Sequence, residues 1–150
     1  EFTGTARRMQ KMGEYKGAII IDDYAHHPTE IKATLNGVRQ LYPKNNLKVV
    51  FHPHTFTRTL ALLDDFASSF ALADEVIVLD IYGSAREQQG GVHAKDLLEK
   101  IKINYPTKKI MHIPTLKEVE TYLRDDLKKN EVVVLMGAGD VFRVGENLIS

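Results

Sequence analysis

Two adjacent acids and a pair of histidines follow an apolar run near the start of the chain. The stretch reads DDYAHHPTE and comes directly after Ala18–Ile21, AIII. Carboxylates and imidazoles in this arrangement serve as metal ligands, as an acid–base pair or as hydrogen-bonding groups that hold a ligand. Asp22 or Asp23 would otherwise only cap the helix that starts at Pro28. We favour ligand contact for one of the two acids, because capping leaves the histidines beside them unexplained.

A second histidine pair lies in the stretch FHPHTFTRT. His52 and His54 are two apart in an extended segment, so their side chains point to the same face. With one of the acids they would form a His/Asp metal site, although the spacing matches no strong metal motif. His26 and His27 are direct neighbours whose side chains diverge, which hinders joint chelation of one ion. Hydrogen bonding to a phosphate, nucleotide or carboxylate is therefore favoured, and a metal-dependent phosphoesterase is kept as an alternative.

The same stretch carries an arginine at an expected helix start. Backbone N–H groups, threonine hydroxyls and the Arg58 guanidinium converge there, as an anionic ligand requires. Because the helix dipole disfavours a cation near the N-terminus, Arg58 indicates a functional anion partner. The alternatives are a solvated side chain and an ion pair with Asp64 or Asp65.

Glycines and paired arginines mark two further places. GAGD, Gly137–Asp140, begins a GxGxxG pattern, but Phe142 replaces the third glycine, and a tight turn capped by Asp140 is an equal interpretation. Arg7 and Arg8 form a surface pair or a phosphate clamp. The sequence contains no GxxxxGK[ST] motif and no recognisable nucleophile motif, so a complete enzyme is not evident.

Short apolar runs alternate with amphipathic stretches along the whole chain. Near-continuous apolarity is typical of strands covered on both faces, and stripes at helical spacing predict helices between them. A capping box is expected at Thr115 and Glu118, and residues 5–17 predict an edge strand or hairpin. The predicted strands are Ala18–Ile21, Leu47–His52, Glu75–Asp80, Lys108–Ile113 and Glu131–Met136. Helices are predicted to start at Pro28 and at Thr115, and a last one is predicted over about 141–149. Two more are predicted from apolar stripes, one from Leu60 to Phe70 and one from Leu97 to Tyr105.

This alternation predicts one α/β domain over residues 1–150, with a doubly wound, mostly parallel sheet flanked by helices. Ligands of such sheets gather at the carboxyl ends of the strands. The loops DDYAHHP, HPHTFTR, IYGSAREQQGG and GAGD all follow predicted strands. We therefore expect them to share one rim of the sheet.

Composition excludes several classes of function. The 150 residues include 20 Lys+Arg and 20 Asp+Glu, so net charge gives no argument for nucleic acid or an anionic membrane as partner. The absence of cysteine excludes disulfides and thiolate zinc sites. The apolar runs are far shorter than the roughly 20 residues of a membrane helix, and no signal peptide is visible. We expect a cytoplasmic protein and, because the first residue is Glu1, a piece of a longer polypeptide.

The four loops together resemble the C-terminal domain of the Mur ligases, in particular those that add L-alanine to UDP-N-acetylmuramate. DDYAHHPTEI, FHPHTFTRT, DIYGSAREQQGG and MGAGD carry the resemblance, which runs from TGTARRM to the last helix. HHPTE and HPHTFTRT favour the alanine-adding ligases over their sister enzymes. A muropeptide-recycling ligase is the nearest alternative, and Tyr24 and Glu30 favour the alanine-adding type.

The resemblance implies an ATP-dependent amide ligase of peptidoglycan precursor synthesis. In this family ATP converts the muramate carboxylate to an acyl phosphate, and the amine of alanine then displaces phosphate. An N-terminal domain binds the UDP-sugar, a central P-loop domain holds ATP and most of the Mg²⁺ ligands, and the C-terminal domain closes over the nucleotide. We therefore expect this chain to be inactive by itself. A non-catalytic nucleotide-binding module is a further alternative.

Individual residues match family positions. The resemblance implies that Arg8 reaches the ATP phosphates and that Asp23 binds the nucleotide at its ribose, both as catalytic groups. Tyr24, His26 and His27 match the loop that lines the nucleotide and acyl phosphate, and His54 and Arg58 match residues that hold the carboxylate of the amino acid. His52 stands where members often have Gln, and Thr55 where some have a second Arg. No residue of this chain is implied as a metal ligand.

Overall fold

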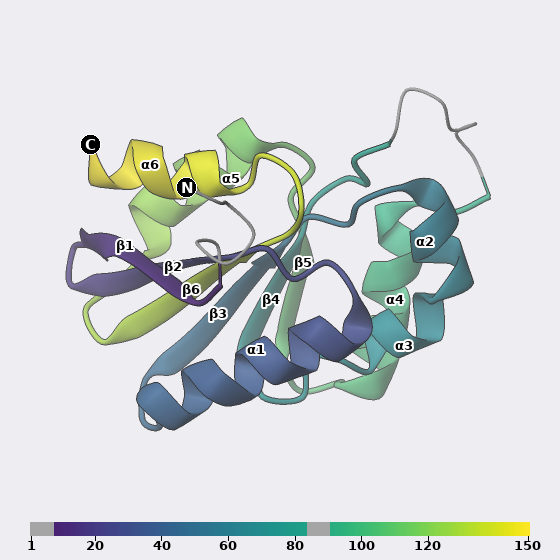
Figure 1. Cartoon of the computed structure of the whole chain (residues 1–150), viewed down its shortest axis with the longest axis horizontal. Coiled ribbons are helices and arrows are strands. Elements are labelled where there is room, and N and C mark those ends of the chain that lie inside the picture. The colour runs from purple at the N-terminus through teal and green to yellow at the C-terminus, as the bar shows by residue number, and fades with distance from the viewer. Residues whose placement is uncertain (1–7, 84–90) are drawn as a thin grey trace.

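A six-stranded, mostly parallel sheet forms the centre of the molecule (Figure 1). The computed structural model describes residues 8–83 and 91–150. The strand order is β1-β2-β6-β3-β4-β5, and only the edge strand β1 is antiparallel to its neighbour. The strands are β1 Gln10–Tyr15, β2 Ala18–Asp23, β3 Asn46–Phe51, β4 Glu75–Val78, β5 Lys109–His112 and β6 Glu131–Met136. The doubly wound α/β fold expected from the sequence is thereby confirmed.

Helices cover both faces of this sheet (Figure 1). They are α1 Pro28–Leu41, α2 Phe56–Ala61, α3 Leu63–Ala67, α4 Ala94–Asn104, α5 Leu116–Asp126 and α6 Phe142–Ile149. α1, α3 and α4 pack on one face, and α5 and α6 pack on the other. From β2 to β5 the chain advances across the sheet in one direction, and it then returns to place β6 between β2 and β3. For the connection from β5 back to β6 to be right-handed, α5 must lie on the face of the sheet opposite to α1, α3 and α4.

Each face has its own hydrophobic core. Val132, Val134 and Met136 of β6 point into one core, and Val133 and Leu135 point into the other. Every residue of β6 is buried. This two-sided burial explains why the strands are apolar without alternation.

The N-terminal hairpin has a specific turn. β1 and β2 are joined through Lys16 and Gly17, whose φ angles are +54° and +85°. A positive φ at both central residues is the requirement of the type I′ turn. This turn is common in hairpins because its twist matches that of the flanking strands. The expected edge hairpin is confirmed.

One local prediction was wrong, and a second is confirmed only for the Thr115 side chain, which accepts from Glu118 N–H. The helix expected from Leu60 to Phe70 is two short helices that meet at Leu62, where the backbone leaves helical values (φ −115°, ψ 23°). Leu60 is therefore exposed rather than part of a buried stripe. The capping box expected at α5 is incomplete, because the Glu118 carboxylate accepts from the Thr115 hydroxyl instead of a backbone N–H. At α4 the Asp96 carboxylate accepts from the His93 backbone N–H (2.8 Å), which is the half of the box that α5 lacks.

Candidate functional site

The strand ends form a continuous rim, as expected. Backbone hydrogen bonds extend the pairing of the strands past their ends, from Gly137 N–H to the Asp23 carbonyl (3.2 Å) and from His52 N–H to the Met136 carbonyl (3.0 Å). The loops after β2, β6, β3 and β4 therefore start side by side. Residues 84–90, most of the third predicted loop, lie outside the described residues.

Asp23 anchors the N-terminal segment to the rim. Its side chain is buried and accepts from Ala25 N–H (2.8 Å) and Met9 N–H (2.7 Å). Burial raises the pKa of the Asp23 carboxyl, and hydrogen bonds from Ala25, Met9 and Thr34 and the nearby charge of Arg8 oppose the rise without cancelling it. Asp23 thus holds the backbone next to the exposed Arg8.

The capping interpretations of the acids are not supported. The N-cap of α1 is His27, which makes no side-chain cap hydrogen bond, so neither Asp22 nor Asp23 caps this helix. The N-cap of α6 is Val141, also without a side-chain cap, so Asp140 does not cap it either. The polar residues at these loops therefore need another explanation.

The two neighbouring histidines differ in their surroundings. Nδ1 of His26 lies 3.0 Å from the Tyr24 carbonyl oxygen and 3.5 Å from the Glu30 carboxylate. The rings of Tyr24 and His26 meet edge to face at 5.0 Å. His27 is exposed beside them. The loop thus presents one fixed and one exposed imidazole next to a half-exposed tyrosine.

His52 and His54 share one aromatic partner, Tyr82. The His54 ring stacks on Tyr82 at 5.3 Å with an interplanar angle of 29°, and the His52 ring meets Tyr82 edge to face at 5.6 Å. The two histidines thus face the same side, as their spacing predicts. Sequence reasoning did not single out Tyr82, although an aromatic residue just after a strand end in IYG was an available signal.

His52 is a buried imidazole with an unsatisfied nitrogen. Its Nδ1 is the one buried side-chain nitrogen or oxygen without a hydrogen-bond partner among residues 8–83 and 91–150. Burial lowers the pKa of His52, and the charge of His54 lowers it further, while Asp140 and Asp80 oppose the shift. A lowered pKa keeps this ring neutral at pH 7.

The GAGD loop packs its backbone directly against His52. A Cβ at Gly137 would lie 2.9 Å from the His52 carbonyl oxygen, and Gly137 has a φ of +152°. A Cβ at Gly139 would meet the Tyr82 ring at 3.8 Å, which is ordinary contact. The first glycine is therefore required by close approach, and the second is not.

Arg58 lies beside His54 at the start of α2. Thr55 caps this helix by accepting from Arg58 N–H (3.1 Å), and its φ of +69° is unusual for a residue with a side chain. The Arg58 guanidinium donates to the His54 carbonyl at 3.4 Å. Asp64 pairs instead with Lys100 (2.9 Å), and no described acid pairs with Arg58. The ion-pair alternative for Arg58 is therefore not supported.

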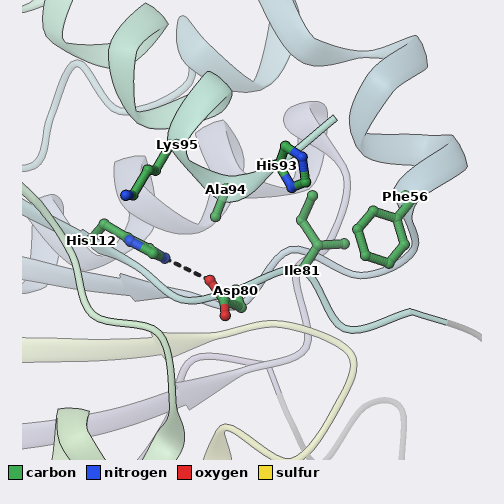
Figure 2. A pocket seen from close by; sticks show the side chains of 7 residues that line it. All are labelled: Phe56, Asp80, Ile81, His93, Ala94, Lys95 and His112. Atoms are coloured by element: carbon green, nitrogen blue, oxygen red, sulfur yellow. Dashed lines mark hydrogen bonds and ion pairs between the residues drawn. The ribbon is translucent and has the colours of Figure 1, made fainter. Parts of the chain in front are cut away.

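A separate cavity of about 520 Å³ lies farther along the rim, over the ends of β4 and β5 (Figure 2). His112 Nε2 and the Asp80 carboxylate meet at 2.7 Å on one side of it. The lining residues are Phe56, Asp80, Ile81, His93, Ala94, Lys95 and His112. None of the predicted site residues lines this cavity.

The described residues offer neither a metal site nor a membrane-spanning helix. No three His, Asp or Glu side chains of the described residues are placed to hold one metal ion, so the phosphoesterase alternative lacks a ligand set there. Across the same part of the chain, no helix has the length and apolarity that crossing a membrane demands.

Comparisons with known proteins agree with the resemblance. The family model described as "Mur ligase, glutamate ligase domain" matches residues 7–139. The UDP-N-acetylmuramate–L-alanine ligase of Desulfitobacterium hafniense is 43% identical over 99% of this chain and 33% of its own length. That of Alkaliphilus metalliredigens is 44% identical over 99% of this chain and 32% of its own length. The chain spans about one third of the curated relatives it matches.

Solved structures support the fold. A murein peptide ligase of Psychrobacter arcticus superposes with a TM-score of 0.77 at 22% identity, over 95% of this chain and 29% of that one. A UDP-N-acetylmuramate–alanine ligase of Thermotoga maritima gives a TM-score of 0.74 at 24% identity, with the same coverage. With the match of the family model over most of its length, the chain belongs to the Mur ligase family.

Proposed function

We propose that the chain is the C-terminal domain of an ATP-dependent ligase that joins L-alanine to UDP-N-acetylmuramate in peptidoglycan precursor synthesis. The observation that carries this proposal is the identity of 43 to 44% to ligases of that name along nearly all of the chain. Residues 1–150 then form one domain, and the N-terminal and central domains of the same polypeptide are its partners. We also place the enzyme in the cytoplasm, where ATP and nucleotide sugars are available.

The loop after β2 and the N-terminal segment form the nucleotide side of the rim. In this proposal Arg8 stabilises the charge that develops on the transferred phosphoryl group as the muramate carboxylate attacks ATP and ADP leaves. Asp23 fixes the backbone that carries Arg8, and since each carboxylate oxygen has two lone pairs, it also accepts a bond from a ribose hydroxyl. Tyr24, His26 and His27 line the nucleotide and the acyl phosphate.

The loop after β3 forms the amino-acid side. His54 and Arg58 bind the carboxylate of alanine, as a charge-assisted pair of donors would. The free amine of alanine then attacks the acyl carbon, the tetrahedral intermediate expels phosphate, and the nitrogen loses a proton to give the amide. Thr55 supplies no charge, so Arg58 is the only arginine of this loop that is available for the carboxylate.

Phosphoryl transfer from ATP needs Mg²⁺, which we assign mainly to the central domain. The 150 residues contain no P-loop, so we expect the isolated chain to bind ATP weakly and to release no phosphate from it. A muropeptide-recycling ligase remains the alternative substrate assignment. It is less favoured, because the curated relatives that are 43 to 44% identical to this chain are UDP-N-acetylmuramate–L-alanine ligases.

The proposal is tested by phosphate release from the full-length parent polypeptide with ATP·Mg. UDP-N-acetylmuramate is combined in turn with L-alanine, glycine, L-serine and the tripeptide L-alanyl-γ-D-glutamyl-diaminopimelate. We expect turnover that requires both the sugar nucleotide and L-alanine. Turnover only with the tripeptide would transfer the assignment to the recycling ligase, and turnover that ignores every amino compound would refute an amide ligase.

A further inference from the structure

Tyr82 lies where three loops of the rim converge. Its backbone pairs with the segment after β3, with Thr55 N–H donating to the Tyr82 carbonyl and Tyr82 N–H donating to the Pro53 carbonyl, both at 2.8 Å. This isolated bridge sets His54 directly opposite Tyr82. The position of Gly139 against the Tyr82 ring adds the loop after β6 to the same cluster.

The side chain of Tyr82 is not a core residue. It is 48% exposed, so it contributes little to the hydrophobic cores below the rim. Its ring instead stacks against the His54 ring and meets the His52 ring edge to face. A half-exposed aromatic residue that contacts two histidines at a strand end is better explained by the site than by stability of the fold.

The backbone of His54 is held on both sides, which leaves the orientation of its ring to side-chain contacts. The bridge to Tyr82 and the helix cap at Thr55 hold the main chain on both sides of it. The last side-chain bond of a histidine has only a weak intrinsic torsional preference, so contacts of the ring set the orientation of the imidazole. Stacking against a flat neighbour restricts this rotation, and the Tyr82 ring lies at 29° to the imidazole.

We propose that Tyr82 is a positioning residue of the amino-acid subsite, which holds the His54 imidazole in the orientation that binds the substrate carboxylate. The inference rests on the proposed function, because it presumes that His54 contacts an amino acid. Tyr82 then acts through its ring, and its hydroxyl is dispensable.

The test uses the full-length parent enzyme and the Michaelis constants of L-alanine and ATP. We expect Tyr82→Leu to raise KM for L-alanine roughly three- to tenfold, the range that corresponds to an aromatic pair, with kcat nearly unchanged. Tyr82→Phe keeps the ring and should behave as wild type. Tyr24→Leu is the reciprocal control, since it removes an aromatic partner of a histidine on the nucleotide side and should raise KM for ATP instead.

A double-mutant cycle with His54→Ala separates positioning from general damage to the site. If Tyr82 acts through His54, Tyr82→Leu adds nothing to KM for L-alanine once His54 is alanine. Hydroxylamine, an amine without a carboxylate, should consume the acyl phosphate of the Tyr82→Leu enzyme at the wild-type rate. A merely structural defect would lower that rate as well.

Three outcomes would overturn the inference: an unchanged KM for L-alanine in Tyr82→Leu, a similar rise in Tyr82→Phe, or additivity with His54→Ala. Failure of the proposed function has a different signature. In that case the wild-type enzyme itself shows no turnover that depends on L-alanine, so the two failures cannot be confused.

Discussion

Gly137→Ala should damage the rim far more than the same change two residues later. The new Cβ would lie 2.9 Å from the His52 carbonyl oxygen and 3.2 Å from the His52 Cβ. The His52 backbone cannot retreat easily, because its N–H is bonded to the Met136 carbonyl at 3.0 Å. The GAGD loop must therefore move, and alanine must also adopt a φ near +152°.

The cost follows from these two terms. An overpacked contact and a residue with an unfavourable φ each cost about 1–3 kcal/mol, so we expect Gly137→Ala to lower the free energy of unfolding by about 2–6 kcal/mol. Gly139→Ala is the matched control, since its Cβ meets only atoms at 3.8 Å or more and its φ is not positive. That change should be neutral or stabilising by less than about 1 kcal/mol.

Urea unfolding of the chain, followed by circular dichroism, measures both values. The same two changes in the parent enzyme should raise KM for L-alanine only in Gly137→Ala, because the displaced loop lies against His52 and Tyr82. Equal stability of the two variants would refute the steric reasoning. Equal KM values with unequal stability would remove the loop from the amino-acid side of the rim.

The remaining predictions concern a buried lysine and the Asp23 anchor. Lys48→Met should cost about 2–4 kcal/mol of stability, because it leaves three partly buried carboxylates without their cation. Lys109→Met, at a half-exposed side chain, should cost less than about 1 kcal/mol. The midpoints of urea unfolding compare the two variants. Burial alone would raise the pKa of Asp126 and lower that of Lys48, but their hydrogen bond and charges reverse both shifts. The contribution of Asp126 to folding stability is therefore present above pH 3.8 and is lost as pH falls through its lowered pKa. The contribution of Lys48 is present below pH 10.5 and is lost as pH rises through its raised pKa. A profile of stability against pH that is equally steep in Lys48→Met would contradict this. Asp23→Asn should speed hydrogen exchange at the Met9 amide about tenfold, because one amide oxygen cannot replace two acceptor atoms, and unchanged exchange measured by NMR would show that the anchor is unimportant.

The parallel strands could be predicted because burial on both faces leaves an unambiguous pattern. EVVVLM in β6 has no alternation, and it is buried throughout. Lys48 interrupts a similar run in β3 and gives no sign in the sequence of being fully buried. It is buried because Glu75, Asp126 and Glu131, which are distant in sequence, surround its ammonium group. The sequence pattern records apolarity, and it does not record such long-range charge pairing.

The candidate site was predictable by location and less so by contact. Residues that follow strands must meet at one edge, which places His54 and Asp23 on the same rim. The bond from Met9 to Asp23 joins residues 14 apart, and the stack of His54 on Tyr82 joins different loops. Both depend on the register of the sheet, which motifs do not specify.

The most direct test of the account is a comparison of Arg8→Ala and Arg58→Ala in the parent enzyme, by initial rates of ADP formation with UDP-N-acetylmuramate, ATP·Mg and varied L-alanine. The account predicts that Arg8→Ala lowers kcat on the order of 10³-fold, since it removes charge stabilisation at the phosphoryl group. It predicts that Arg58→Ala raises KM for L-alanine about 10- to 100-fold with a smaller change in kcat, since it removes a charge-assisted bond to the carboxylate. The same kinetic change in both variants would contradict the division of the rim into a nucleotide side and an amino-acid side, and wild-type kinetics in both would contradict its role as a ligand site.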